Sequence, residues 1–568
     1  MTEKALTYGR EDRPPLRDSL LLGAQHAVVA LVFLVYPLAA AQEIGLDPAS
    51  TARFLTACVL GIGISTFLHA FRPSVGSGAL AVEIPTPIFL PAAVMAGAAG
   101  GLSMLAAISL LSGCIEVLFA RALKHIKNLF PAEVCGIAVM MLGISIVKAG
   151  MMNAVGVTTP DSAVHAPALF TSASALLTIV VVSVFGSPAV KLLAIACGLA
   201  TGVLAAYLTG ILDGDSMHHL AVAAWLAWPD VTVAVPHLKI EFVPVAVVMA
   251  LVLSVDNVGM LIGIQRQMDP AWRKIDLKQA SGGVQVSGIG DIVSGIFGGI
   301  PTGISSANVA LAHATGAVAR RLSWVIGLML VVAAFSPKVM IALTMVPRPV
   351  VGAVMVYASI YMVMSGMALI HGRMLSDRRI FVIGFSLVMG LTSVVLPGIY
   401  AEVPALLRPI FLSPLATSTL VAMLLTFVFS IGASARASVE VNLSNSPNES
   451  LQEYEINKTL RAPLEMLGAD VGADRASLDR SIDVTAEFVA ALQISGTVRG
   501  PVRVAARFDD ARLQISLAYA GDAPAMPGDG RSPANAYGAR LARIAQNINK
   551  LSATDRGGNQ EVVLLFEP

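Results

Sequence analysis

The sequence predicts an all-α polytopic membrane protein that carries a small soluble α+β domain at its C-terminal end. Three observations predict this fold class: the composition, a series of long apolar runs, and a change of composition near residue 434. Of 568 residues, 55% are hydrophobic and only 13% are charged, whereas soluble domains contain about 25% charged residues. The mean hydropathy is +0.74. A net charge of +1 gives no indication of a nucleic-acid partner, and we expect none.

Long apolar runs define the membrane part of the chain. A helix needs about 20 mostly apolar residues to cross a bilayer, and runs of that kind recur about fourteen times between Leu20 and Ile431. They start near Leu20, Thr51, Ala79, Leu102, Pro131, Ala168, Ala189, Phe242, Ser281, Gly303, Leu322, Val350, Ile380 and Ile410. We therefore predict about fourteen spans, arranged as two halves of about seven spans each.

Lysine and arginine indicate the orientation of the spans, because cytoplasmic loops carry an excess of both residues. With the N-terminus in the cytoplasm, the main basic clusters fall on the cytoplasmic side. These clusters lie at 121–127, 266–278, 320–321 and 373–379. The predicted outer loops at 151–167 and 211–238 contain neither lysine nor arginine. We therefore expect both termini in the cytoplasm and the spans in the inner membrane of a bacterium.

The sequence divides into three predicted parts. Residues 1–18 form a polar cytoplasmic segment without the apolar core of a signal peptide, so the first apolar run is a retained span. Residues 19–434 form the transmembrane domain. Residues 435–568 are richer in charge and contain no spanning run, which predicts a soluble cytoplasmic domain. Strand-like stretches such as VRVAARF and LQISLAYA accompany helical ones such as LDRSIDVTAEFVAAL there, as in an α+β sandwich.

Two of the apolar runs are interrupted or preceded by proline and glycine, at the third span of each predicted half. One reads GSGALAVEIPTPIFLP (76–91) and the other GGIPTGISSANVALAHATG (298–316). Broken spans at corresponding positions of two halves indicate a transporter binding site, because irregular backbone at membrane depth has to line a cavity or be buried in protein. The alternative is a pair of packing kinks, but both breaks also carry polar residues. We predict half-helices in spans 3 and 10.

Ionisable side chains inside the membrane are costly to bury and mark functional sites. Asp256 lies deep in the first span of the second half and has no basic residue within a helical turn, which makes it a candidate substrate ligand and proton carrier. Glu83 lies at the first break and is a candidate for both roles; a cap for the following half-helix is its alternative. Glu116 lies about a turn from a basic loop, so a structural ion pair explains it as well as function does.

Uncharged polar side chains gather at the second break. Ser305, Ser306 and Asn308 donate and accept hydrogen bonds, which suits a flat neutral heterocycle. Hydrogen bonds between helices are the alternative. Gln25 and His26 lie in the first span, where bridging between helices explains His26 better than substrate binding does.

The chain shows no pattern typical of a metal site, a cofactor site or an enzyme. Its four cysteines lie in apolar runs and form no CxxC pair, so we interpret them as buried apolar residues. The sequence contains no Walker A motif, which leaves primary energy coupling unsupported and a proton or sodium gradient as the energy source.

At these residues the chain resembles the nucleobase–ascorbate transporter family, the xanthine/uracil permeases, over residues of about 15–435. The Gln25–His26 pair is similar to the family's first-span Gln-His pair, and Gly76–Ser77 is similar to the entry into its third span. SGIFGGIPTGISSAN (294–308) is similar to the family's SG-x-x-G-x-x-P-x-T stretch, and VPRPVVG (346–352) is similar to another family stretch.

The family's tenth-span signature is matched in part. Asn308, Thr315 and Gly316 match it, whereas Ala307 stands where the family has a polar ligand residue. A methyl group cannot hydrogen-bond a base edge, and sites built on hydrogen bonds discriminate strongly. We therefore hypothesise that Glu83 faces the same cavity from the opposing half-helix and supplies the missing carboxylate.

The resemblance implies a fold of seven plus seven inverted repeats, with a core domain and a gate domain, assembled as a homodimer. It implies proton-linked uptake of a nucleobase of the xanthine/urate or uracil class, held between the eighth span and the two half-helices. Asp256 corresponds to the eighth-span acid and Ala307 to the tenth-span ligand, with backbone groups near Gly303 as further contacts. Thr315 joins Gln25 and His26 as a residue for helix bridging or gating.

Two other functions stay open. The sulfate-permease family shares this general architecture. Binding of its anion would require a positive residue near the half-helices, and none lies in 76–91 or 298–316. A solute sensor would signal through the C-terminal domain. That domain weakly resembles the ATP-binding fold of anti-sigma-factor kinases, with a last helix at 538–551. The nucleotide signatures expected near Glu487 and Tyr519 are missing, so we expect a regulatory module or a binding module for a cytoplasmic protein.

Overall fold

The computed structural model describes two compact units. Residues 6–566 are described apart from 73–74, 127–131, 158–161, 213–219, 232, 269–275, 372–373, 431–437, 444–448, 472, 474, 495–497, 510–511, 523–543, 545–547, 549 and 556–558. One unit comprises Met1–Met367 with Ile383–Leu424, and the other comprises Ala368–Val382 with Leu425–Pro568. Each unit has a hydrophobic core of its own.

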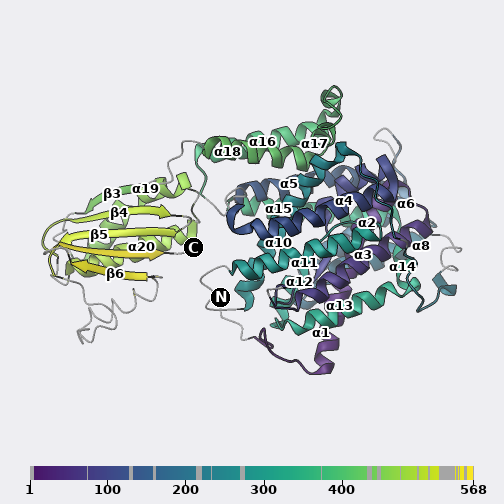
Figure 1. The fold of residues 1–568 in the computed structure, drawn as a ribbon, viewed down its shortest axis with the longest axis horizontal. Helices are drawn as coiled ribbons and strands as arrows, with labels where there is room; N and C mark the ends of the chain where they lie inside the picture. Colours follow the sequence, from purple (N-terminus) through teal and green to yellow (C-terminus); the bar gives the residue numbers. More distant parts are fainter. Residues whose placement is uncertain are drawn as a thin grey trace. The chain divides into compact units, whose positions relative to one another are not determined.

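Helices build the first unit (Figure 1). Its first half contains α1 (Leu16–Val32), α2 (Val35–Ile44), α3 (Pro48–His69), η1 (Pro87–Phe89), α4 (Leu90–Ile126), α5 (Ala132–Val155), α6 (Ala166–Phe185), α7 (Pro188–Lys191) and α8 (Ala194–Leu208). The chain continues through η3 (Ile240–Phe242), α10 (Val243–Met268), α11 (Leu277–Ile296), α12 (Ser306–Thr315), α13 (Arg321–Ala334), α14 (Pro337–Thr344), α15 (Arg348–His371), α16 (Asp377–Val395), η4 (Pro397–Tyr400), α17 (Arg408–Leu412) and α18 (Pro414–Ser430).

The helices have the length and apolarity of a membrane protein. In the described part of the chain, eight are long and apolar enough to cross a bilayer, and the pair α13–α14, bent by 78°, is a ninth candidate. The sequence predicts about fourteen spans, and α4 explains part of the difference. Its 37 residues form one element, although Gly100 and Gly101 leave the helical region of φ/ψ space. The hydropathy pattern places separate apolar runs before and after this kink.

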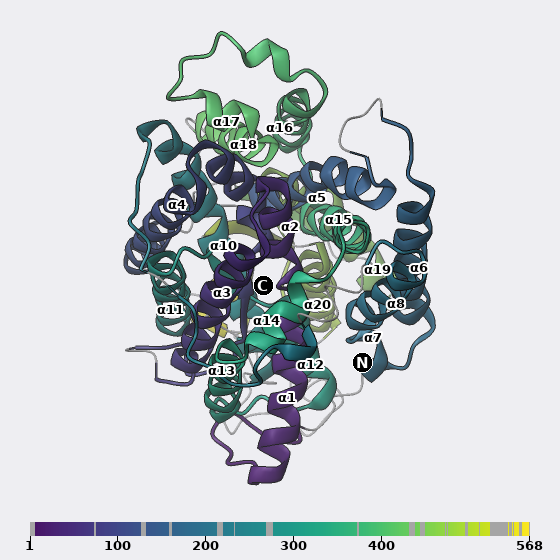
Figure 2. The same ribbon diagram turned by 90° about the vertical axis from the view of Figure 1, so that its right-hand side faces the viewer.

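Helix α11 packs against both α4 and α3, and the three helices lie in the same part of the unit in Figure 2. Small residues let its backbone approach that of α4, as is common between helices in membranes. A Cβ atom on Gly113 of α4 would lie 2.4 Å from the Gly288 carbonyl oxygen, and one on Gly288 of α11 would lie 2.8 Å from the Gly113 oxygen. The close contact fixes α11 directly behind the two broken segments.

The two breaks meet as a pair of short antiparallel strands, β1 (Glu83–Pro85) and β2 (Thr302–Ile304). Glu83 pairs with Ile304 and Pro85 with Thr302. A helical segment follows each strand: η1 and α4 after β1, and α12 after β2. The Ser305 hydroxyl caps α12 by accepting a hydrogen bond from the Asn308 backbone N–H. Each predicted half-helix therefore begins where an extended segment ends.

The N-terminal segment pairs with the chain that follows α12. Tyr8 forms a parallel bridge with Ala317, and the Val318 backbone N–H donates to the Tyr8 carbonyl at 2.9 Å. The Arg10 side chain donates to the Gly78 carbonyl, which precedes β1. A hydrogen bond to Asp18 raises the pKa of the Tyr8 hydroxyl. This segment thus contacts the chain next to both breaks.

The C-terminal part of the second unit contains, in its described residues, a five-stranded antiparallel sheet packed with helices α19 (Glu449–Val471) and α20 (Arg475–Ile494). The strands are β3 (Ser438–Leu443), β4 (Val502–Asp509), β5 (Arg512–Ala520), β6 (Lys550–Asp555) and β7 (Asn559–Phe566), in the order β3-β4-β5-β7-β6. Helices α19 and α20 share its hydrophobic core. Most of the stretch 538–551, in which the sequence predicts a helix, lies outside the described residues; Lys550 and Leu551 belong to β6.

Candidate functional site

A cavity of about 490 Å³ lies between the two broken segments. Its wall includes residues from β1, η1, β2 and α12, together with residues from α2, α5, α7, α8, α10 and α15. The first break contributes Ile84 and Pro87, and the second contributes Gly303 and Ser306. The irregular backbone at membrane depth therefore lines a cavity, which is one of the two conditions under which such backbone is tolerated.

The cavity brings together four of the ligands predicted from the sequence: Asp256, Gly303, Ser306 and Ala307. Asp256 lies near the middle of α10. Ser306 and Ala307 are the first residues of α12, so the N-terminal end of that helix borders the cavity. A helix N-terminus carries a partial positive charge and unpaired N–H groups. A solute in the cavity would thus meet a carboxylate and a set of backbone donors.

Glu83 is not among the residues that line this cavity, so the hypothesis that it supplies a carboxylate there stays a prediction. Successive side chains of a strand point to opposite faces. Ile84 borders the cavity, whereas the Glu83 carboxylate lies against His69 of α3 and Ser287 of α11. The Glu83 side chain has no exposed surface.

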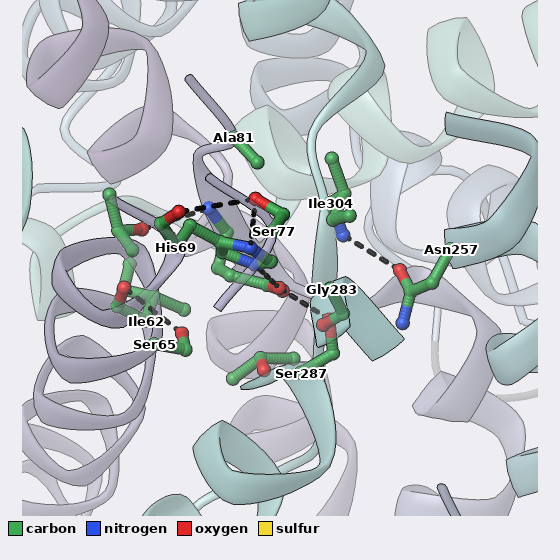
Figure 3. A network of polar contacts seen from close by, with 12 residues as sticks. Ile62, Ser65, His69, Ser77, Ala81, Asn257, Gly283, Ser287 and Ile304 are labelled. Carbon is green, nitrogen blue, oxygen red and sulfur yellow. Dashed lines mark hydrogen bonds and ion pairs between the residues drawn. The ribbon is translucent and has the colours of Figure 1, made fainter. Parts of the chain in front are cut away.

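Glu83 belongs to a network of buried polar contacts, of which Figure 3 labels His69, Ser77 and Ser287. The His69 Nε2 atom lies 2.8 Å from Glu83 Oε1, and the Ser287 hydroxyl donates to the same oxygen at 2.6 Å. The second His69 nitrogen, Nδ1, lies 3.0 Å from the Ser77 hydroxyl. The Glu83 backbone N–H donates to the Thr66 hydroxyl. Glu83 Oε2 is buried without a hydrogen-bond partner among the described residues.

A second buried carboxylate, Asp291 of α11, holds the other strand. Its Oδ1 atom accepts a 2.6 Å hydrogen bond from the Thr302 backbone N–H, and its Oδ2 atom accepts one from the Ser112 hydroxyl at 2.8 Å. Asp291 therefore ties β2 to α11 and α4. The sequence interpretation missed it, although the rule that singles out Asp256, an ionisable residue inside an apolar run, applies to Asp291 as well.

Glu116 of α4 is the third buried carboxylate. Among the described residues, its side-chain hydrogen-bond partners are Ser254 and Asn257 of α10, at 3.4 and 3.3 Å. Asn257 also accepts a 2.9 Å hydrogen bond from the Ile304 backbone N–H (Figure 3). The Asn257 amide thus joins the strand next to the cavity to Glu116, while its neighbour Asp256 faces the cavity.

The hydrogen bonds of Asn308 lie within the protein. Its Oδ1 atom lies 2.7 Å from His26 Nδ1, and its amide nitrogen donates to the Ser305 hydroxyl at 3.0 Å. His26 therefore bridges α1 and α12. Neither Ser305 nor Asn308 is among the cavity-lining residues, and both make hydrogen bonds at the start of α12; their direct contact with substrate stays a prediction.

The two remaining predicted residues lie apart from the cavity. Gln25 is exposed on α1. The Thr315 hydroxyl donates to the Leu311 and Ala312 carbonyls of its own helix, and the Thr315 carbonyl accepts from the Thr7 hydroxyl. Thr315 thus lies where the N-terminal segment meets the end of α12.

No group of three or more histidine, cysteine, aspartate and glutamate side chains in the described residues has the geometry to hold a metal ion. The four cysteines are free thiols. The candidate site therefore consists of one carboxylate, one lysine, backbone groups and neutral side chains around a cavity, with three carboxylates behind its wall.

Comparison with known proteins identifies relatives of the first unit. A family model described as a permease family matches residues 17–399. A putative purine permease of Clostridium perfringens is 25% identical over 431 residues, which is 75% of this chain and 94% of that protein. The xanthine permease XanP of Escherichia coli is 25% identical over 443 residues, with the same coverage of 75% and 94%. The uric acid transporter UacT of Escherichia coli is 23% identical over 428 residues, covering 72% and 86%.

The fold also resembles a solved structure. The murine Slc26a9 anion transporter in the inward-facing state is 13% identical, with a TM-score of 0.52, over 77% of this chain and 72% of that chain. At this identity the likeness concerns the fold alone.

Proposed function

Because this chain belongs to the permease family of xanthine and uracil transporters, we propose that it carries a nucleobase across the inner membrane by proton-coupled secondary transport. The observation that supports this function best is the cavity between the two broken segments, which is lined by Asp256 and by the first residues of α12. The same family membership favours transport over enzymatic catalysis. The proposed location is a bacterial inner membrane, with lipid around the helices.

The walls of the cavity suit a flat heterocycle. Tyr36 lines it next to Phe33, and the two rings stack with centroids 5.8 Å apart. Tyr357 and Tyr361 line the α15 side, with ring centroids 4.8 Å apart. Aromatic faces bind planar rings through stacking. In this proposal, Asp256 accepts a hydrogen bond from a ring N–H.

The second break supplies the remaining contacts in the proposed complex. Ala307 offers no side-chain hydrogen bond where the family has a ligand residue. The backbone N–H groups at the start of α12 and the Ser306 hydroxyl therefore bind the exocyclic oxygen atoms of the base. Gly303 keeps this wall free of a side chain, so that the ring can approach the backbone.

The proposed architecture has fourteen spans in two inverted repeats of seven. Splitting α4 at Gly100 and Gly101 yields a third and a fourth span, and the strand-helix units at β1 and β2 are the third and tenth. An antiparallel meeting of the two breaks agrees with repeats of opposite orientation. We further propose cytoplasmic termini, a core and a gate domain, and a homodimer.

Proton coupling is assigned to the carboxylates on both sides of the strand pair. Asp256 borders the cavity, and Glu83 lies directly behind its wall with His69 as an ionisable partner. A proton on Glu83 changes its hydrogen bonds to His69 and Ser287, and these three residues belong to the broken segment, α3 and α11. Protonation there thereby biases the position of the wall that the substrate touches.

Radiolabelled uptake into proteoliposomes tests the proposal, with purines, pyrimidines and sulfate offered at two external pH values. We expect uptake of at least one nucleobase, faster from the more acidic side, and no sulfate uptake. Uptake of sulfate without any nucleobase would replace the proposal with the inorganic-anion alternative.

The solute-sensor alternative has a separate test. Deletion of residues 440–568 removes the C-terminal sheet and helices. A transporter without these residues keeps its uptake, and we expect this result. A protein that binds nucleobase with and without the deletion but never transports it would be a sensor.

A further inference from the structure

We infer that Lys191 sets the charge preference of the cavity, and that the preferred substrate is a planar heterocycle in its anionic form, such as the monoanion of an oxidised purine. This inference rests on the proposed function, because it concerns the same cavity. It adds to that function a residue and a charge state that the sequence interpretation did not contain.

The cavity has one acid and one base in its wall. Among the described lining residues, Asp256 and Lys191 are the two that carry a charge at neutral pH. Lys191 is the last residue of the short helix α7, between α6 and α8. It lies far in the sequence from both breaks, at 76–91 and 298–316.

The ammonium group of Lys191 is available for a ligand. Its side chain is exposed, and no carboxylate of the described residues lies within ion-pair distance of it. Helix α7 contacts α12, the helix whose first residues Ser306 and Ala307 form part of the wall. The lysine therefore belongs to the cavity rather than to a structural ion pair.

A second positive feature of the wall favours an anion, as Lys191 does. The N-terminal end of α12 borders the cavity at Ser306 and Ala307, and its partial positive charge favours an anion. Asp256 alone opposes it. A ligand that satisfies both signs needs an N–H donor for Asp256 and a negative charge delocalised over oxygen or nitrogen for Lys191. A neutral base offers only the N–H donor for Asp256. A tetrahedral inorganic anion offers only the negative charge for Lys191.

The size and walls of the cavity favour the heterocycle over an inorganic anion. Its volume of about 490 Å³ falls in the range of about 300–1,000 Å³ that is typical of organic-ligand pockets. Aromatic side chains at Tyr36, Tyr357 and Tyr361 line it. A small hydrated anion gains nothing from such surfaces, whereas a planar anion stacks on them.

Binding of two purines to the purified full-length protein tests the inference. Urate is an anion at neutral pH, and hypoxanthine is neutral. In wild-type protein we expect urate to bind more tightly. Lys191→Gln should weaken urate binding about fivefold, in line with a partly exposed charge contact of about 1 kcal/mol. The same substitution should leave hypoxanthine within about twofold, and Lys191→Arg should retain the preference for urate.

A matched control is Lys148→Gln, since Lys148 is also exposed but lies on α5 outside the cavity. It should change neither affinity. Equal weakening of both purines by Lys191→Gln, or no effect on either, would overturn the inference while the proposed function stands. Such a result would leave Lys191 as one more basic residue of a cytoplasmic loop. Failure of wild-type protein to bind any nucleobase would overturn the proposed function together with the inference.

Discussion

His69 and Glu83 form a pair with no exposed surface, in which His69 Nε2 lies 2.8 Å from Glu83 Oε1. His69 is the last residue of α3, and Glu83 is the first residue of the strand that backs the cavity. A proton on this pair is shielded from water by protein, yet it lies one residue from Ile84 in the cavity wall. The pair therefore connects an ionisable group to the substrate cavity without placing that group in contact with substrate.

Glu83→Gln should abolish proton-driven accumulation of substrate while the protein is still expressed and folded. The amide keeps an oxygen that accepts from Ser287, but it cannot take up and release a proton in the physiological range. Exchange of labelled for unlabelled substrate, which needs no net proton movement, should persist. The measurement is uptake with and without a pH gradient in proteoliposomes.

Glu402→Gln provides the control for this prediction, because Glu402 is exposed and lies outside the network. It should accumulate substrate like the wild type. Wild-type accumulation by Glu83→Gln as well would remove Glu83 from the coupling mechanism.

Asp256→Asn should weaken substrate binding without destabilising the fold. Asp256 lines the cavity, and its charge contributes to hydrogen bonds with a ligand that are worth about 1.5–3 kcal/mol, or roughly ten- to a hundredfold in affinity. We expect the melting temperature of the detergent-solubilised protein to stay close to that of the wild type. A variant with unchanged affinity would place substrate away from Asp256.

Asp291→Ala, in contrast to Asp256→Asn, should mainly lower the thermal stability of the protein. Removing this carboxylate leaves the buried Thr302 N–H and the Ser112 hydroxyl without their acceptor, which costs about 1–3 kcal/mol for each group left unpaired. The melting temperature should fall clearly below those of wild type and Asp256→Asn. An unchanged melting temperature would show that other groups or water replace the acceptor, and that Asp291 does not hold β2.

His26 and Asn308 should be energetically coupled, because their side chains share a buried 2.7 Å hydrogen bond between α1 and α12. A double-mutant cycle with His26→Ala and Asn308→Ala should yield a coupling energy of about 1 kcal/mol in thermal stability. The pair Gln25→Ala and Asn308→Ala is the matched control, since Gln25 is exposed one residue away. Additive effects for His26 and Asn308 would contradict a helix-bridging role.

Part of the site follows from the sequence because its signals are local. Proline and glycine in two apolar runs predict the breaks, and the structure has extended segments at both. The position of Asp256 within an apolar run singles it out, and it lies in the cavity wall. The membrane character of the first unit follows from composition alone, because the bilayer requires long apolar helices whatever their arrangement.

The sequence by itself determined that the first unit is a helical membrane protein, where two of its apolar runs break and that Asp256 is a candidate ligand, since each depends on hydropathy or backbone preference within a few residues. Only the tertiary structure decided which carboxylates meet the cavity. Packing of α3 and α11 behind β1 places His69 and Ser287 around the Glu83 carboxylate, and Ser287 lies more than 200 residues from Glu83 in the sequence. The same applies to Lys191, Asp291 and His69, whose neighbours come from other helices. Their roles depend on packing between distant parts of the chain, which no local pattern of residues records.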